Sequence, residues 1–161
     1  HIVMVGDLKR GRTVRSLSQL MRNFTGVRLT FAAPEAFRMA PDILDFLRAH
    51  GVPFRETDDL DSALADADAV YMTRIQDEHD KDGESGKVDA SPFHLSRERM
   101  RRLPKGAVVL HPLPRREEIP SELDDDPRVV VFRQERNGMW IRAALIAHIF
   151  GLDEEILARK P

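Results

Sequence analysis

Three short stretches of the chain carry side chains suited to holding a small anionic ligand. Arg12 follows a glycine-bounded turn, Arg74 and Gln76 follow an apolar run, and residues 112–114 read Pro-Leu-Pro. The planar guanidinium of arginine matches a carboxylate or a phosphate. Because prolines have no N–H, the Pro-Leu-Pro segment presents its carbonyl groups as acceptors for an amine or amide. Together these stretches suit a ligand with two carboxylates. Taken alone, each arginine is better explained by a surface ion pair, and the prolines by a turn.

Each of these stretches follows a run of apolar residues that is typical of a buried strand. The runs cover residues 2–5, 69–72 and 107–110. In a parallel sheet the carboxyl ends of the strands lie at one edge, where ligands bind. We therefore expect Arg12 and Arg74 to converge on one cleft at this edge.

The first stretch combines a strand, a tight loop and a helix. Residues 2–5 lead into Gly6, and after Arg12 the apolar residues recur at helical spacing. The N-terminus of a helix attracts anions through its free N–H groups and the positive end of its dipole. Lys9 and Arg10 add positive charge at the same place, so the loop is a candidate anion site.

A nucleotide-binding loop is an alternative interpretation of this stretch. Gly6 and Gly11 are separated by four residues and Thr13 follows, but Arg12 stands where a P-loop requires lysine. No later apolar run ends in an aspartate suited to magnesium. The dinucleotide fingerprint needs two glycines separated by one residue, and it is not met. A third possibility is that the glycines only form the turn and the basic residues are solvated.

Strand-like and helix-like segments alternate along the rest of the chain. The patterns predict further strands at 27–33 and 128–132, and a short extended piece around 54–56. They predict helices at 41–50, 58–64, 96–103 and 139–150. Strands separated by helices favour a parallel sheet with right-handed crossovers. We therefore predict an α/β fold with three α/β/α layers, doubly wound around a mainly parallel sheet. It would be Rossmann-like without the dinucleotide fingerprint.

The segment 77–90 is polar, contains Gly83 and Gly86, and has no periodicity. It is long for a connection inside a compact domain, which predicts a mobile functional loop. A disordered surface insertion is the alternative.

Composition narrows the possible classes of protein. The 161 residues suit one domain, and 42% apolar with 32% charged residues is ordinary for a globular protein. The net charge of −2 gives no overall field that favours nucleic acid. The chain has no cysteine, which excludes disulfides, thiolate metal sites and a cysteine nucleophile. No run is long and apolar enough for a membrane span, and no signal peptide is recognisable, so we expect no membrane partner. Because the overall charge does not favour nucleic acid, we expect no nucleic-acid partner either.

Four motifs, taken in their order along the chain, resemble the aspartate-binding half of an aspartate carbamoyltransferase. They are residues 6–16, Met72-Thr73-Arg74-Ile75-Gln76, His111-Pro112-Leu113-Pro114-Arg115, and Phe132-Arg133-Gln134 with Asn137-Gly138. The similarity extends to about Phe150. The related ornithine enzymes typically have a cysteine in place of Pro112 and a Ser-Met-Gly motif in place of Thr-Arg-x-Gln. Aspartate is therefore favoured over ornithine.

The resemblance implies a role for each matching position. Arg12 and Arg74 would bind the carboxylates of aspartate, and Gln76 would assist and order the loop. The backbone of Leu113 and Pro114 would bind carbamoyl phosphate and orient the attacking amine. The supporting positions are Pro112, Arg115 and Lys9. His111 is expected to be structural rather than a base.

The resemblance also implies the chemistry. The amino group of aspartate would attack the carbamoyl carbon directly, with no covalent enzyme intermediate, no cofactor and no metal. Positioning and charge stabilisation would then supply the catalysis. At the position where the family usually has a further arginine, this chain has His79. Closure of the mobile loop 77–90 over a ligand is therefore expected to be weaker or to use another partner.

The resemblance covers only one half of such an enzyme. The chain starts at His1, almost directly on a core strand, so we expect a cut chain without its N-terminal carbamoyl phosphate domain. Residues 1–150 would form the aspartate-binding domain and residues 151–161 a tail. By itself the piece is expected to be inactive. The intact chain is expected to be a cytoplasmic homotrimer, and a non-catalytic scaffold derived from this domain is the alternative.

Overall fold

A five-stranded parallel sheet forms the centre of the computed structural model, which describes residues 1–80, 83 and 85–159. The strand order is β3-β2-β1-β4-β5. The strands are β1 (Ile2–Val5), β2 (Leu29–Ala32), β3 (Phe54–Thr57), β4 (Ala69–Met72) and β5 (Val108–Leu110). The winding direction reverses between β1 and β4, and in open α/β sheets such a reversal marks the ligand-binding crevice.

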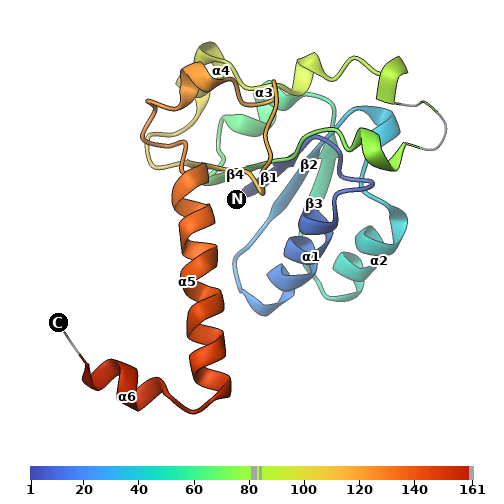
Figure 1. Cartoon of the computed structure of the whole chain (residues 1–161). Helices are drawn as coiled ribbons and strands as arrows, with labels where there is room; N and C mark the ends of the chain where they lie inside the picture. The colour runs from blue at the N-terminus through green and yellow to red at the C-terminus, as the bar shows by residue number, and fades with distance from the viewer. Residues whose placement is uncertain (81–82, 84, 160–161) are drawn as a thin grey trace.

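Helices cover both faces of this sheet, which confirms the predicted three-layer α/β fold (Figure 1). The α-helices are α1 (Arg12–Leu20), α2 (Pro41–Ala49), α3 (Leu60–Leu64), α4 (Arg97–Arg102), α5 (Val131–Ile149) and α6 (Asp153–Ala158). Short 3₁₀ turns lie at Met21–Asn23, Glu35–Phe37, Asp77–His79, Ser85–Lys87, Ser91–Phe93 and Ser121–Leu123. Helices α1 and α2 lie on one face, and α3 and α4 lie on the other.

The alternation of side chains along β1 supplies both cores. Val3 and Val5 belong to the core under α3 and α4, whereas Met4 belongs to the core under α1 and α2. All three side chains are fully buried. Because both faces are covered, the strand is an unbroken apolar run, as is typical of a parallel sheet.

The predicted strand at 128–132 is wrong. Val129 forms only an isolated parallel bridge with Val109, and α5 begins two residues later at Val131. The N–H of Gln134 donates to the carbonyl of Val130, so the first helical hydrogen bond has already formed at this point. The β-branched run favours a strand only where a strand partner exists along its whole length. Here the pairing ends after one residue.

Helix α5 also starts earlier than its apolar pattern predicts. Residues 137 and 138, expected to precede the helix, lie inside it. The helix leads away from the sheet, and α6 follows within the segment expected to be a tail (Figure 1). Trp140, Ile149 and Phe150 are exposed there. In the described part of the chain, no helix has the length and apolarity that crossing a membrane requires.

Candidate functional site

A cavity of about 190 Å³ opens at the carboxyl ends of β1, β4 and β5. Its lining residues are Arg12, Thr13, Thr73, Arg74, Gln76, His111, Pro112 and Leu113. The structure thus brings together two arginines that are separated by more than sixty residues in the sequence, as the strand-end argument predicts. Pro112 and Leu113, from the loop after β5, complete the wall.

The β1 loop, residues 6–11, can approach the β4 loop, residues 73–80, only because it contains glycine. Gly6 has φ +109°, and a Cβ there would overlap the carbonyl oxygen of Thr73 and lie 2.8 Å from its Oγ1. At Gly11 a Cβ would lie 2.6 Å from the carbonyl oxygen of Asp7. Both glycines therefore serve close backbone contacts next to the cavity.

The same loop is not a P-loop. In a P-loop, successive backbone N–H groups point at the phosphates. Here the N–H groups of Leu8 and Lys9 donate to the carbonyl of Phe37, at 3.0 and 3.1 Å. The N–H of Arg10 donates to the Asp7 carboxylate at 3.1 Å, and the N–H of Gly11 donates to the Asp7 carbonyl. The loop uses these donors internally, so they form no phosphate cradle.

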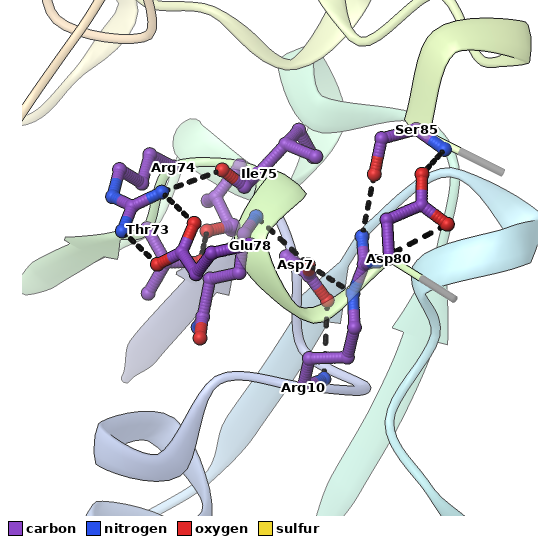
Figure 2. A network of polar contacts seen from close by, with 10 residues as sticks. Asp7, Arg10, Thr73, Arg74, Ile75, Glu78, Asp80 and Ser85 are labelled. Atoms are coloured by element: carbon purple, nitrogen blue, oxygen red, sulfur yellow. Dashed lines mark hydrogen bonds and ion pairs between the residues drawn. The ribbon is translucent and has the colours of Figure 1, made fainter. Parts of the chain in front are cut away.

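The fully buried Asp7 lies at the centre of a network of polar contacts between the β1 and β4 loops (Figure 2). Its Oδ2 accepts hydrogen bonds from Nε of Arg10 at 2.7 Å and from the backbone N–H of Gln76 at 3.1 Å. The Arg10 side chain continues to the hydroxyl group of Ser85 at 3.0 Å and lies over the ring of Phe37. One carboxylate therefore fastens the β1 loop to the β4 loop beside Arg74.

The two arginines of the cavity differ in their partners. Arg74 forms an ion pair with Glu78 and donates through Nη1 to Oε2 at 2.8 Å (Figure 2). This hydrogen bond lowers the pKa of Glu78 to about 2 and raises the pKa of Arg74 above its ordinary value. Arg12 lies at the first position of α1 and makes no side-chain hydrogen bond or ion pair with another described residue. Its guanidinium is available to an anion.

The β5 loop, residues 111–115, brings an unusual backbone conformation to the cavity wall. Leu113 has φ +56°, a left-handed value that costs a non-glycine residue roughly 1–3 kcal/mol. Its N–H donates to Nδ1 of the buried His111 at 2.8 Å. Pro114 follows through a cis peptide bond.

Three positions that the resemblance implicates do not line the cavity. Arg115 forms an ion pair with Asp124, with Nη2 donating to Oδ2 at 2.6 Å, and lies over the ring of Phe132. Pro114 and Lys9 are exposed. The Arg115 side chain is therefore held in an ion pair outside the cavity.

Sequence reasoning assigned no role to Thr13 and Thr73, which also line the cavity. Thr73 is buried, and its hydroxyl group donates to the carbonyl of Val5 at 3.0 Å. Their positions in the sequence could have indicated this location, because each threonine is adjacent to an arginine of the cavity.

The segment 77–90 is described only in part. Residues 81, 82 and 84 lie outside the described residues, so the predicted mobility of this loop stays a prediction. His79 is exposed within a 3₁₀ turn, and its backbone N–H donates to the carbonyl of Gln76. Among the described residues, no three His, Asp or Glu side chains are grouped to hold a metal ion.

Comparison with known proteins gives one consistent family. The family model for the Asp/Orn-binding domain of aspartate/ornithine carbamoyltransferases matches residues 1–149. The multifunctional protein CAD of Squalus acanthias is 45% identical over 150 residues, which is 93% of this chain and 7% of that protein. The chloroplastic aspartate carbamoyltransferase of Arabidopsis thaliana is 40% identical over 148 residues, covering 90% of this chain and 37% of that protein.

Solved structures agree with the sequence comparison. The catalytic subunit of M. jannaschii aspartate transcarbamoylase superposes with a TM-score of 0.84 at 35% identity, covering 95% of this chain and 49% of that one. The Trypanosoma cruzi enzyme in complex with N-(phosphonacetyl)-L-aspartic acid has a TM-score of 0.82 at 36% identity, covering 90% and 47%. The chain thus spans less than half the length of these relatives.

Proposed function

This chain belongs to the Asp/Orn-binding domain family of aspartate/ornithine carbamoyltransferases, and from that premise we propose that it is the aspartate-binding half of an aspartate carbamoyltransferase. The complete enzyme would transfer the carbamoyl group of carbamoyl phosphate to the amino group of L-aspartate. The products would be N-carbamoyl-L-aspartate, an early intermediate of pyrimidine synthesis, and phosphate.

The observation that carries this proposal is the pair of guanidinium groups at one cavity. Arg12 and Arg74 line it from two different strand ends. A ligand with two carboxylates satisfies both, and each charge-assisted hydrogen bond is worth about 1.5–3 kcal/mol before desolvation and ordering are subtracted. Gln76 adds an amide to the same wall.

The charges around the cavity also support aspartate over ornithine. The side-chain ammonium group of ornithine needs a carboxylate or several carbonyl acceptors. None of the eight described lining residues is acidic, and two are arginines. A second carboxylate on the ligand therefore matches the cavity, whereas a second ammonium group would meet like charge.

The β5 loop would position the reacting groups. We assign the backbone of Leu113 and Pro114 to carbamoyl phosphate and to the attacking amine. Supporting roles fall to Pro112, Arg115 and Lys9. The amine nitrogen forms a bond to the carbamoyl carbon and loses a proton, the bond from that carbon to the phosphate oxygen breaks, and phosphate leaves. Catalysis would come from orientation and from charge stabilisation by the arginines, with no cofactor.

The rest of the site would come from outside this chain. We propose that an N-terminal domain holds carbamoyl phosphate, that residues 1–150 act as the aspartate-binding domain, and that the complete chain is a cytoplasmic homotrimer. Basic residues borrowed from a neighbouring subunit would complete the site. In a complete chain, Arg74→Ala should lower kcat/KM for aspartate by roughly tenfold to thousandfold. Formation of N-carbamoyl-L-aspartate by the 161-residue chain alone would contradict this division of the site.

A direct binding test uses the 161-residue chain and NMR titration with L-aspartate and L-ornithine. We expect weak aspartate binding, because an open cavity leaves the charges largely solvated, and no ornithine binding. Arg74→Ala should weaken aspartate binding by about tenfold or more. Arg101→Ala is the matched control, since it removes an exposed arginine of α4. Ornithine binding as well as aspartate would overturn the assignment, and a chain that binds neither ligand would favour the scaffold alternative.

A further inference from the structure

A buried pair of titratable side chains, one of them in the β5 loop, has no part in the substrate contacts assigned above. His111 is 2% exposed and Glu118 is 6% exposed. Nε2 of His111 lies 2.9 Å from Oε1 of Glu118 and has no other described polar partner. Burying a carboxylate is costly unless it is paired, so this pair needs a reason beyond filling space.

The hydrogen bonds of His111 define the state of its ring. The N–H of Leu113 donates to Nδ1, so Nδ1 carries no proton. The ring proton of a neutral histidine is then on Nε2, the nitrogen that faces the Glu118 carboxylate. The same Glu118 oxygen accepts the backbone N–H of Arg116 at 2.8 Å. Glu118 therefore selects the tautomer in which Nδ1 can accept from Leu113.

The residue at the end of this chain of contacts forms part of the cavity wall. Leu113 lines the cavity and has the left-handed φ of +56°. A leucine keeps such a conformation only when its surroundings over-determine it. The hydrogen bond from its N–H to His111 is the described contact that fixes its backbone nitrogen.

We propose that Glu118 is a positioning residue, which acts through His111 to hold Leu113 in its left-handed conformation and so sets the wall that faces the carbamoyl group and the attacking amine. This inference rests on the proposed function for the identity of the ligand. The conformational link itself is independent of that function. His111 is then neither a base nor a packing residue but the connection between Glu118 and the cavity.

Charges around the pair support an ionised Glu118. Burial raises its pKa, but the hydrogen bonds from His111 and from the N–H of Arg116 outweigh this effect, and the net pKa lies below the ordinary value. Arg74 and Arg115 also interact electrostatically with this carboxylate. At neutral pH, Glu118 is therefore a charged acceptor for the Nε2 proton.

Two substitutions of His111 separate positioning from general stabilisation. In His111→Asn the side-chain oxygen takes the place of Nδ1, so it can still accept from Leu113 while the link to Glu118 is lost. In His111→Gln the amide takes the place of Nε2, so the contact with Glu118 can remain while the acceptor for Leu113 is lost. A role limited to stability predicts similar ligand affinity for both variants at equal folded fraction.

The test measures the affinity of the 161-residue chain for N-(phosphonacetyl)-L-aspartate together with NMR of the His111 ring and the Leu113 amide. We expect His111→Gln to weaken binding at least about fivefold more than His111→Asn does. Glu118→Gln, which keeps an acceptor, should bind almost as the parent chain does. Glu118→Leu should lose the Nε2–H tautomer and the protection of the Leu113 amide from exchange. Asp126→Ala, which breaks the Asp126–Arg128 ion pair, is the control for lost stability.

Each outcome separates this inference from the proposed function. Equal losses in the Asn and Gln variants, or an unchanged His111 tautomer and Leu113 amide in Glu118→Leu, would overturn the positioning role. If the parent chain does not bind the probe, the proposed function fails. The tautomer and the amide exchange then still decide whether Glu118 controls Leu113. If both His111 variants are unfolded, the comparison of Glu118→Gln with Glu118→Leu decides it.

Discussion

The two loops that bring the cavity arginines together are built in opposite ways. The β1 loop is held by close backbone contacts, by two required glycines and by the fully buried Asp7. The β4 loop, residues 73–80, shares these buried contacts at Thr73 and Gln76. Its remaining described side-chain contacts include exposed ion pairs, Arg74 with Glu78 and Asp77 with Arg116. Buried contacts define one geometry, whereas exposed ion pairs contribute little and exchange readily with water.

This difference assigns different tasks to the two arginines. Arg12 is the first residue of α1 and directly follows the well-packed β1 loop. Its guanidinium lines the cavity and is accessible to a ligand. Arg74 already has a carboxylate partner in Glu78, which a ligand carboxylate would replace or share. We infer that the β1 side of the cavity is preorganised and that the β4 side adapts when the ligand binds.

The largest effect is expected at the contact between the two loops. Gly6→Ala places a Cβ against the Thr73 backbone at a φ of +109°. Overpacking and the unfavourable φ should together cost about 3–5 kcal/mol of unfolding free energy. Urea denaturation followed by circular dichroism measures this loss.

A second glycine provides the matched control for Gly6. Gly26 also has a positive φ, +73°, but a Cβ there would meet nothing within 4 Å. Gly26→Ala should therefore cost only the backbone term, about 1 kcal/mol. Equal losses in the two variants would show that close approach to Thr73 is not what defines the β1 loop.

A smaller loss is expected when Asp7 keeps its shape and loses its charge. Asp7→Asn weakens the acceptor for Arg10 and for the N–H of Gln76, and hydrogen bonds to a charged group contribute about 1.5–3 kcal/mol. Part of this loss should appear as faster amide exchange at Gln76, because that N–H joins the β4 loop to the β1 loop. Unchanged exchange at Gln76 would mean that the β4 loop does not depend on this anchor.

The sheet and the convergence of its loops were predictable from the sequence because they depend on local patterns. Strands β1 and β4 have the predicted bounds, 2–5 and 69–72, since each is a short apolar run that ends abruptly. Parallel pairing then places their ends at one edge, whatever the details of the loops. The meeting of Arg12 and Arg74 follows from this rule alone.

Features that depend on a specific partner could not be predicted in this way. The run 128–132 has strong strand propensity, but only Val129 finds a partner on β5. The apolar pattern of α5 predicts a helix without indicating where it begins or that its side chains are exposed. Propensity cannot settle either point, because it does not report which neighbour is present.

Part of the site could not be predicted from the sequence for the same reason. Leucine gives no sequence signal for the left-handed conformation of residue 113. Glu118 lies seven residues beyond His111 in an acidic connector, where a solvated carboxylate is the ordinary expectation. The role expected for Arg115 came from resemblance, and its pairing with Asp124 shows that a matching motif does not by itself place a side chain in the cavity.

The smallest expected effect concerns the adaptable side of the cavity and is a pH dependence. The pKa of Glu78 is about 2, against an ordinary value of 4.5. A carboxylate whose pKa is lowered by folding stabilises the folded state fully above its unfolded pKa, and this contribution is lost as the pH falls through the folded pKa. The contribution of the Arg74–Glu78 ion pair to the stability of the fold should therefore be complete at neutral pH and decline below about pH 4.5. The ion pair itself should be lost near pH 2, where Glu78 becomes protonated in the folded chain.

NMR titration of the Glu78 side-chain carboxyl carbon measures this directly. In the parent chain the midpoint should lie near pH 2, and in Arg74→Gln it should return toward 4.5, because the Arg74 hydrogen bond is the main cause of the shift. Glu78 is exposed, so molar salt should also raise the midpoint, whereas the buried contacts of Asp7 should be insensitive to salt. A parent midpoint near 4.5 would mean that Arg74 is as free as Arg12 and would remove the contrast between the two loops. A midpoint near 2 that does not respond to salt would mean that the β4 loop is as rigid as the β1 loop.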